Sequence, residues 1–184
     1  MNLIDRVKNI LLTPKTEWQV IKSETTTVST MLTSYVLPLS LIPAIIALIA
    51  GLRLSFTYGL IMAVIAIISA VIIFYVGTYV ADALAPSFSS EKNLNRSAQL
   101  IGYSYTASAV ASILGIIPVL AILAALAGFG YMVYLLYLGT QPLKSTPEDK
   151  RIGYTIVIIL VQIVLYFILS AVFASLFLRS YMPY

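Results

Sequence analysis

The sequence contains no cysteine and no histidine. Without cysteine there can be no disulfide bond, no thiolate metal site and no cysteine nucleophile. Without histidine the chain lacks the side chain that most often serves as a general base or metal ligand near neutral pH. A His-Glu-x-x-His zinc motif and a phosphate-binding P-loop are absent as well. The sequence therefore predicts no enzyme activity and no cofactor.

Charged residues are also scarce. They make up 10% of the chain, against 60% for hydrophobic residues, and the mean hydropathy is +0.99, far above the range of soluble proteins. One membrane-spanning helix takes about 20 predominantly apolar residues. The stretch from Ser97 to Leu143 has no charged side chain and is long enough for two such helices. The sequence therefore predicts an integral membrane protein.

The positions of the charged residues divide the chain into apolar runs that predict five transmembrane helices. These helices cover about residues 32–52, 57–81, 98–115, 119–140 and 153–178. The third and fourth are separated at Gly115–Pro118, because glycine loosens a helix and proline removes a backbone donor. We expect an all-α fold in which residues 25–184 form the five-helix transmembrane domain.

Basic residues define the expected orientation. Of the 11 Lys and Arg residues, only Arg53 and Arg179 fall on the far side when the N-terminus is cytoplasmic. This positive-inside bias predicts a cytoplasmic N-terminus, and an odd number of helices then places Tyr184 outside. The net charge of +4 thus follows from topology and predicts no nucleic-acid partner.

Residues 1–24 are predicted to form a cytoplasmic amphipathic segment. Leu3, Val7 and Ile10 recur at helical spacing, and Thr13-Pro14 suits the end of one helix and the start of a second. A basic amphipathic helix with a tryptophan beside a membrane domain usually lies in the headgroup layer. We expect Ile10 and Trp18 to be membrane-surface anchors, with docking of a partner protein as the alternative.

Tyrosines concentrate in the predicted cytoplasmic half, where they form either a hydroxyl-lined pocket or partner surface, or a thick aromatic belt. Asp82 is expected to pair with Arg96 or Lys92 at the membrane border. The acidic residues after Pro147 fit a helix start, with a recognition role as the alternative. The candidate cytoplasmic-side pocket or partner surface consists of Tyr75, Tyr79, Asp82, Arg96, Gln99, Tyr103, Tyr105, Tyr131, Glu148, Asp149 and Tyr154.

Small residues repeat at helical spacing in the third and fourth predicted helices. Ser108 and Ala111 belong to two such stripes in the third helix, and Ala124 and Gly128 form another in the fourth. Small side chains let helices approach closely in lipid, and hydroxyls can bond across the contact. These stripes predict a tight helix contact, with a polar substrate path as the alternative.

Four stretches carry a resemblance to a known family: Leu3–Leu11 followed by Pro14 and Trp18, Gly102–Thr106, Leu135–Gly139 and Thr146–Thr155. In this order they resemble the prokaryotic branch of the Yip1 family, small five-helix membrane proteins with a cytoplasmic N-terminus. The Pro-Glu-Asp-Lys…Gly-Tyr-Thr run of the last stretch is the most specific. The resemblance implies a multi-pass protein, in the cell inner membrane if the source is bacterial.

Eukaryotic Yip1 proteins act in vesicle traffic, where they bind small GTPases and one another. Their Asp-Leu-Tyr-Gly-Pro motif and long acidic cytoplasmic extension are absent from this chain, so the resemblance gives no basis for GTPase binding here. We expect a non-enzymatic scaffold that organises membrane or partner proteins through its cytoplasmic face. Its expected partners are membrane lipids and other membrane proteins or further copies of itself. The alternative is a small transporter or channel for a neutral or weakly polar solute.

Overall fold

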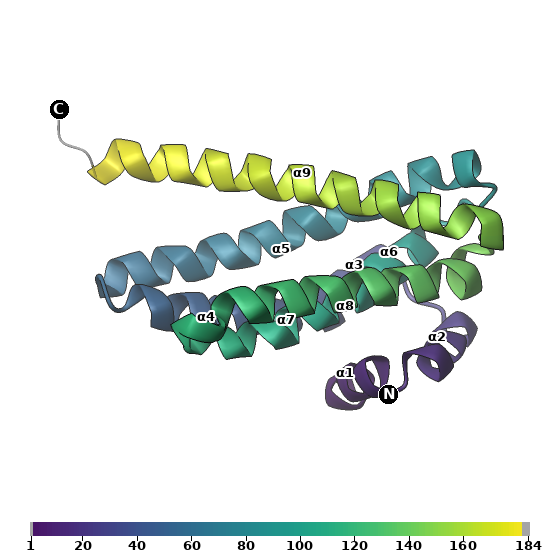
Figure 1. Cartoon of the computed structure of the whole chain (residues 1–184), viewed down its shortest axis with the longest axis horizontal. Coiled ribbons are helices and arrows are strands. Elements are labelled where there is room, and N and C mark those ends of the chain that lie inside the picture. The colour runs from purple at the N-terminus through teal and green to yellow at the C-terminus, as the bar shows by residue number, and fades with distance from the viewer. Residues whose placement is uncertain (1, 182–184) are drawn as a thin grey trace.

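The computed structural model describes residues 2–181, with side chains described as far as Leu176. In this part of the chain every regular element is helical (Figure 1). The helices of membrane-spanning length and apolar composition in the described residues are four: Val28–Gly51, Phe56–Phe88, Pro118–Lys144 and Glu148–Leu176. They confirm the all-α class and correspond to four of the five predicted spans. The predicted outside position of Tyr184 lies beyond the described residues.

Each span is built around one long helix, and two of the spans also include short helical elements. The elements are α3 (Val28–Met31), the π-helical turn η1 (Leu32–Val36) and α4 (Leu37–Gly51), then α5 (Phe56–Leu84) and the 3-10 turn η2 (Ala85–Phe88), then α8 (Pro118–Lys144), then α9 (Glu148–Tyr181). Local chemistry sets their limits. The Ser55 hydroxyl accepts from the Tyr58 amide at 3.1 Å to begin α5, and Ser145 ends α8 in the left-handed conformation at φ 51°.

The third predicted helix, over residues 98–115, is not continuous. It forms α6 (Leu94–Ser104), α7 (Thr106–Ala111) and the 3-10 turn η3 (Ser112–Ile116), so it is not among the four long spans. The Thr106 hydroxyl donates to the Tyr103 carbonyl at 2.7 Å, and the Ser112 hydroxyl donates to the Ala109 carbonyl at 2.6 Å. Such side-chain bonds compete with the regular helical ladder. The predicted break before Pro118 is confirmed, because Ile117 is extended and Pro118 opens α8.

The contact between small residues predicted for this region is present. A Cβ atom added at Gly128 of α8 would lie 2.6 Å from the Ala111 Cβ, and the Ser108 hydroxyl donates to the Gly128 carbonyl at 3.4 Å. Gly51 and Gly59 play the same part where α4 turns into α5, since a Cβ on Gly51 would lie 2.4 Å from the Gly59 Cα. Close approach at these positions requires glycine.

The long helices run roughly along one axis, so the bundle has two distinct ends (Figure 1). The turn η2, the start of α6 and the connection between α8 and α9 lie at one end, here named the α8–α9 end. The α4–α5 turn and the Ile117 corner lie at the opposite end, the α4–α5 end. Apart from Arg53, the described charged residues fall in α1, α2, the end of α5, α6, the end of α8, the start of α9 and the loops that join them, which lie at or toward the α8–α9 end (Figure 1).

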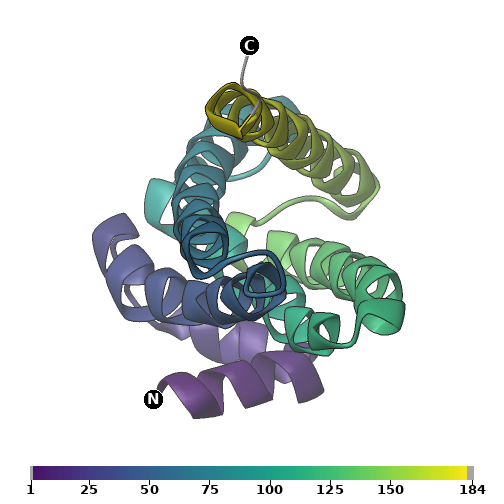
Figure 2. The same cartoon turned by 90° about the vertical axis from the view of Figure 1, so that its left-hand side faces the viewer.

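The N-terminal segment packs into the fold. α1 (Leu3–Leu12) and α2 (Pro14–Ser23) contact α7 and α8, and α1 runs across the bundle in the end-on view of Figure 2. Ile10 is 0% and Trp18 is 1% exposed. The Trp18 ring fills the space left by Gly139, where an added Cβ would meet the Trp18 Cζ2 at 2.9 Å. The structure therefore corrects the surface-anchor prediction for Ile10 and Trp18, which are core residues.

Candidate functional site

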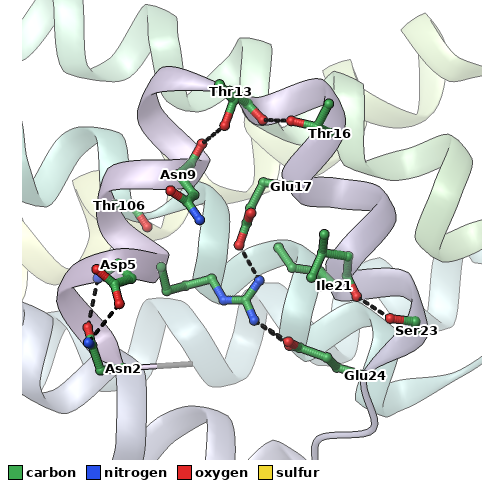
Figure 3. Close-up of polar contacts among 12 residues, drawn as sticks. Asn2, Asp5, Asn9, Thr13, Thr16, Glu17, Ile21, Ser23, Glu24 and Thr106 are labelled. Carbon is green, nitrogen blue, oxygen red and sulfur yellow. Dashed lines mark hydrogen bonds and ion pairs between the residues drawn. The ribbon is translucent and has the colours of Figure 1, made fainter.

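A cluster of charged side chains holds α1 and α2 in place. Arg6 donates to the carboxylates of Glu17 and Glu24, so one guanidinium bridges the two helices. Figure 3 shows Glu17 and Glu24 directed from α2 and its C-terminal end into the space between α1 and α2. Arg6 and Glu17 are buried, and the Arg6 guanidinium lies 5.3 Å from the centre of the Tyr103 ring. These contacts join α1, α2 and α6.

The surroundings of Arg6 favour its charged form. Burial alone lowers the pKa of the guanidinium, but the hydrogen bond to Glu24 and the nearby negative charges more than offset it, so the net shift of the pKa is upward. A raised pKa means that the stabilisation is complete below the ordinary arginine value and is lost only above it. The Arg6 guanidinium therefore stays positively charged throughout the pH range in which proteins stay folded.

Arg96 extends this cluster from α6. Its guanidinium donates to the carbonyls of Lys22 at 2.8 Å and Glu24 at 3.0 Å, at the end of α2 where helix carbonyls lack intrahelical partners. It also donates to the Gln99 side-chain oxygen at 3.0 Å. Arg96 thus serves as a cap for α2 and does not pair with Asp82 as predicted. Arg6, Glu17, Glu24 and Arg96 are named here the Arg6 cluster, and their formal charges cancel.

A second buried pair lies at the α8–α9 end. The Lys144 side chain is 0% exposed, and its ammonium donates to the Asp82 carboxylate at 3.2 Å, the Ser97 hydroxyl at 2.7 Å and the Asn93 carbonyl at 3.2 Å. These partners come from α5, α6 and the segment between them, so Lys144 joins three parts of the fold to α8. Burial of a charge costs free energy unless it is paired and hydrogen-bonded, and here all three ammonium donors have partners.

A pocket lies beside the Arg6 cluster. It has a volume of about 480 Å³ and opens between the start of α1, the loop after α2 and the first turns of α3 and η1. Arg6, Glu24 and Tyr103 line it. It is named here the N-terminal pocket.

The predicted site residues do not gather in one place. Arg96, Gln99 and Tyr103 meet around the Arg6 cluster, as described above. Tyr131 donates to the Leu11 carbonyl at 2.7 Å and ties α1 to α8. Tyr154 is buried and donates to the Ala81 carbonyl between α5 and α9.

The remaining predicted residues are scattered further. The Tyr75 ring packs against Phe74 at 5.6 Å, and Tyr105 packs against the core. Tyr79 is 56% exposed. Asp149 and Glu148 are exposed as well, and Glu148 pairs loosely with Arg151 at 3.6 Å. The described tyrosines therefore stabilise several different helix contacts.

Sequence reasoning missed Arg6, Glu17 and Lys144 as organising residues. A signal was present for the first two: Arg6 falls between Leu3 and Ile10 on the apolar stripe of α1, and Glu17 lies beside Trp18 in the corresponding stripe of α2. Opposite charges on two facing apolar stripes predict a buried pair. Lys144 has no such local signal, because its partner Asp82 is far away in the chain.

The described chain thus combines four apolar helices of membrane length with polar tertiary contacts concentrated toward one end. This combination defines an integral, multi-pass membrane protein. The family model of the Yip1 domain matches residues 8–178, and the chain belongs to the Yip1 family. No curated protein and no solved structure matches the chain.

Proposed function

We propose that this Yip1 protein is a non-enzymatic scaffold that organises membrane or partner proteins through its α8–α9 end and the adjoining α1 and α2. The observation that carries the proposal is the way the buried charges are used. The Arg6 cluster and the Lys144–Asp82 pair tie α1, α2, α5, α6 and α8 into one unit. Other charged side chains, among them Lys15, Lys92 and Asp149, remain exposed on this unit, where they are available to a partner.

We further propose that α6, α7 and η3 together make one more crossing, the third along the chain, which brings the total to five. The α8–α9 end then faces the cytoplasm, and the membrane is the inner membrane if the source is bacterial. α7 and η3 pack along α8, and the small-residue contact at Gly128 is of the kind used between helices in lipid. The excess of Lys and Arg at the α8–α9 end supports the orientation.

Single cysteines test this orientation cleanly, because the chain has none of its own. We expect an impermeant thiol reagent applied to sealed cells to label Thr57→Cys and to leave Ser87→Cys unlabelled until the cells are opened. Both residues are exposed in the structure, so a difference in labelling reports the side of the membrane. Labelling of Ser87→Cys in sealed cells would reverse the proposed orientation.

Site-specific photo-crosslinking in native membranes tests the scaffold role. We expect a photoreactive residue at Lys15, Lys92 or Asp149 to give discrete protein adducts that mass spectrometry identifies as one partner or as the chain itself. The same residue at Leu126, exposed on the apolar part of α8, is the matched control and should give lipid adducts only. Absence of protein adducts from all three polar positions would contradict the proposal.

One observation favours the alternative of a transporter for a small polar solute. Gln162 is 8% exposed in the middle of α9, and its amide oxygen has no hydrogen-bond partner among the described residues. Within the same part of the chain, the buried hydroxyls of Thr78 on α5 and Thr155 on α9 also lack partners. These groups could line a polar route between α5 and α9.

The liposome experiment separates the two functions. Under the scaffold proposal, we expect purified protein in liposomes to give no flux of ions or small polar solutes above that of empty vesicles. Gln162→Leu should leave this background unchanged. Reproducible flux that Gln162→Leu abolishes would favour the transporter.

A further inference from the structure

The N-terminal pocket has the chemistry of a ligand site. Its volume of about 480 Å³ falls within the range of small-molecule sites. Residues that carry a hydroxyl group are numerous among those that line it: Ser23, Thr25, Thr26, Thr30, Ser34, Tyr35 and Tyr103. Hydroxyls donate and accept hydrogen bonds without adding charge, so the lining suits a polar group more than an acyl chain.

The position of the pocket indicates where its ligand comes from. Thr25 and Thr26 lie just before the Val28–Gly51 span, and Thr30 and Ser34 lie in its first turns. The ends of a span are the level at which lipid headgroups lie. Ile4 of α1, beside the pocket wall formed by Leu3, is 77% exposed, as expected for a helix with one face toward lipid.

The charges around the pocket discriminate between headgroups. Arg6 is shared between two carboxylates, and the Arg6 cluster has no net formal charge. The Glu24 side chain is 35% exposed, so its carboxylate can still accept a hydrogen bond from an incoming cation. Tyr103 is 6% exposed and lines the pocket.

We propose that the N-terminal pocket binds the headgroup of a zwitterionic phospholipid that carries a primary ammonium group, such as phosphatidylethanolamine. The ammonium is held by the Glu24 carboxylate, and the hydroxyls of Tyr103, Thr30 and Ser34 donate to the phosphate oxygens. Arg6 is the one cationic side chain among the described residues that line the pocket, and it is already paired with two carboxylates, so it is poorly placed to bind an anionic headgroup. A choline headgroup has no N–H group to donate to Glu24.

Trp18 supplies the readout for this site. It is the only tryptophan, and its ring packs edge-on to the Tyr103 ring at 6.3 Å between centroids, so its emission should respond to occupancy. We expect delipidated protein in detergent, titrated with short-chain phosphatidylethanolamine, to show a saturable change in Trp18 emission. Short-chain phosphatidylglycerol and phosphatidylcholine should bind about tenfold more weakly, since each lacks the charge-assisted bond to Glu24.

Two variants locate the binding. Ser34→Phe places a ring at the mouth of the pocket and should abolish the saturable change. Thr33→Phe is the matched control, because Thr33 is the exposed neighbour and does not line the pocket; it should bind as the wild type does. Circular dichroism and gel filtration confirm that both variants are folded.

Three outcomes would overturn the lipid site. They are preference for phosphatidylglycerol, equal binding of all three lipids, and unchanged binding by Ser34→Phe. The site requires only that Val28–Gly51 crosses the membrane. A negative result here would therefore leave the partner-binding role of the α8–α9 end untouched, and the absence of crosslinked partners would leave the lipid site untouched.

Discussion

Lys144→Met is expected to destabilise the protein more than any surface substitution. Methionine has a similar length but no charge, so the Asp82 carboxylate stays buried without its cation. Breaking a buried ion pair by removing one partner costs about 3–5 kcal/mol. The Ser97 hydroxyl and the Asn93 carbonyl lose the same donor. Thermal or denaturant unfolding in detergent micelles measures the loss.

A double-mutant cycle separates the pair from its surroundings. Asp82→Asn in the Lys144→Met background removes the unpaired charge and should recover part of the stability, whereas Asp82→Asn alone should leave Lys144 unpaired and destabilise the fold. Lys92→Met is the control for charge alone, since Lys92 is exposed and exposed ion pairs contribute only about 0–1 kcal/mol. Wild-type stability in Lys144→Met would show that Lys144 does not hold these elements together.

The span positions followed from the sequence because they depend on local composition. A run of apolar residues must be helical in lipid, where unpaired backbone groups are costly, so charges such as Arg53 and proline at 118 bounded the helices well. The break at Tyr105 was not predictable in the same way. It depends on whether the Thr106 and Ser112 hydroxyls bond to backbone carbonyls or to a neighbouring helix, and the residue types permit both.

The N-terminal segment shows the limit of reasoning from amphipathicity. The helical stripe of α1 was evident, but a stripe shows only that one face is apolar, and lipid or protein can cover it. Here protein covers the apolar faces, because Gly139 of α8 leaves room for the Trp18 ring. Asp82 was likewise expected at the membrane border but was assigned to Arg96 or Lys92 and not to its partner Lys144. Pairing across the chain depends on how the helices are arranged.

The second large effect is expected for Arg6→Leu. Leucine can still pack on the apolar stripe of α1, but Glu17 then stays buried without a counter-ion and Glu24 loses its partner. A cost of about 3–5 kcal/mol is expected for breaking such a pair, and it falls on the contact that holds α1 and α2 to the bundle. We expect α1 and α2 to detach while the four long spans stay folded.

Detachment has two measurable signatures. Limited proteolysis should become much faster in the loop at Glu24–Thr27, and Trp18 emission should shift because its ring leaves the contact with Tyr103. Lys8→Leu is the matched control on the exposed face of α1 and should change neither. Arg6→Leu combined with Glu17→Leu should restore part of the protection, since it removes the unpaired buried charge. Protection as strong in Arg6→Leu as in wild type would mean that apolar packing at Ile10 and Trp18 alone holds the segment in place.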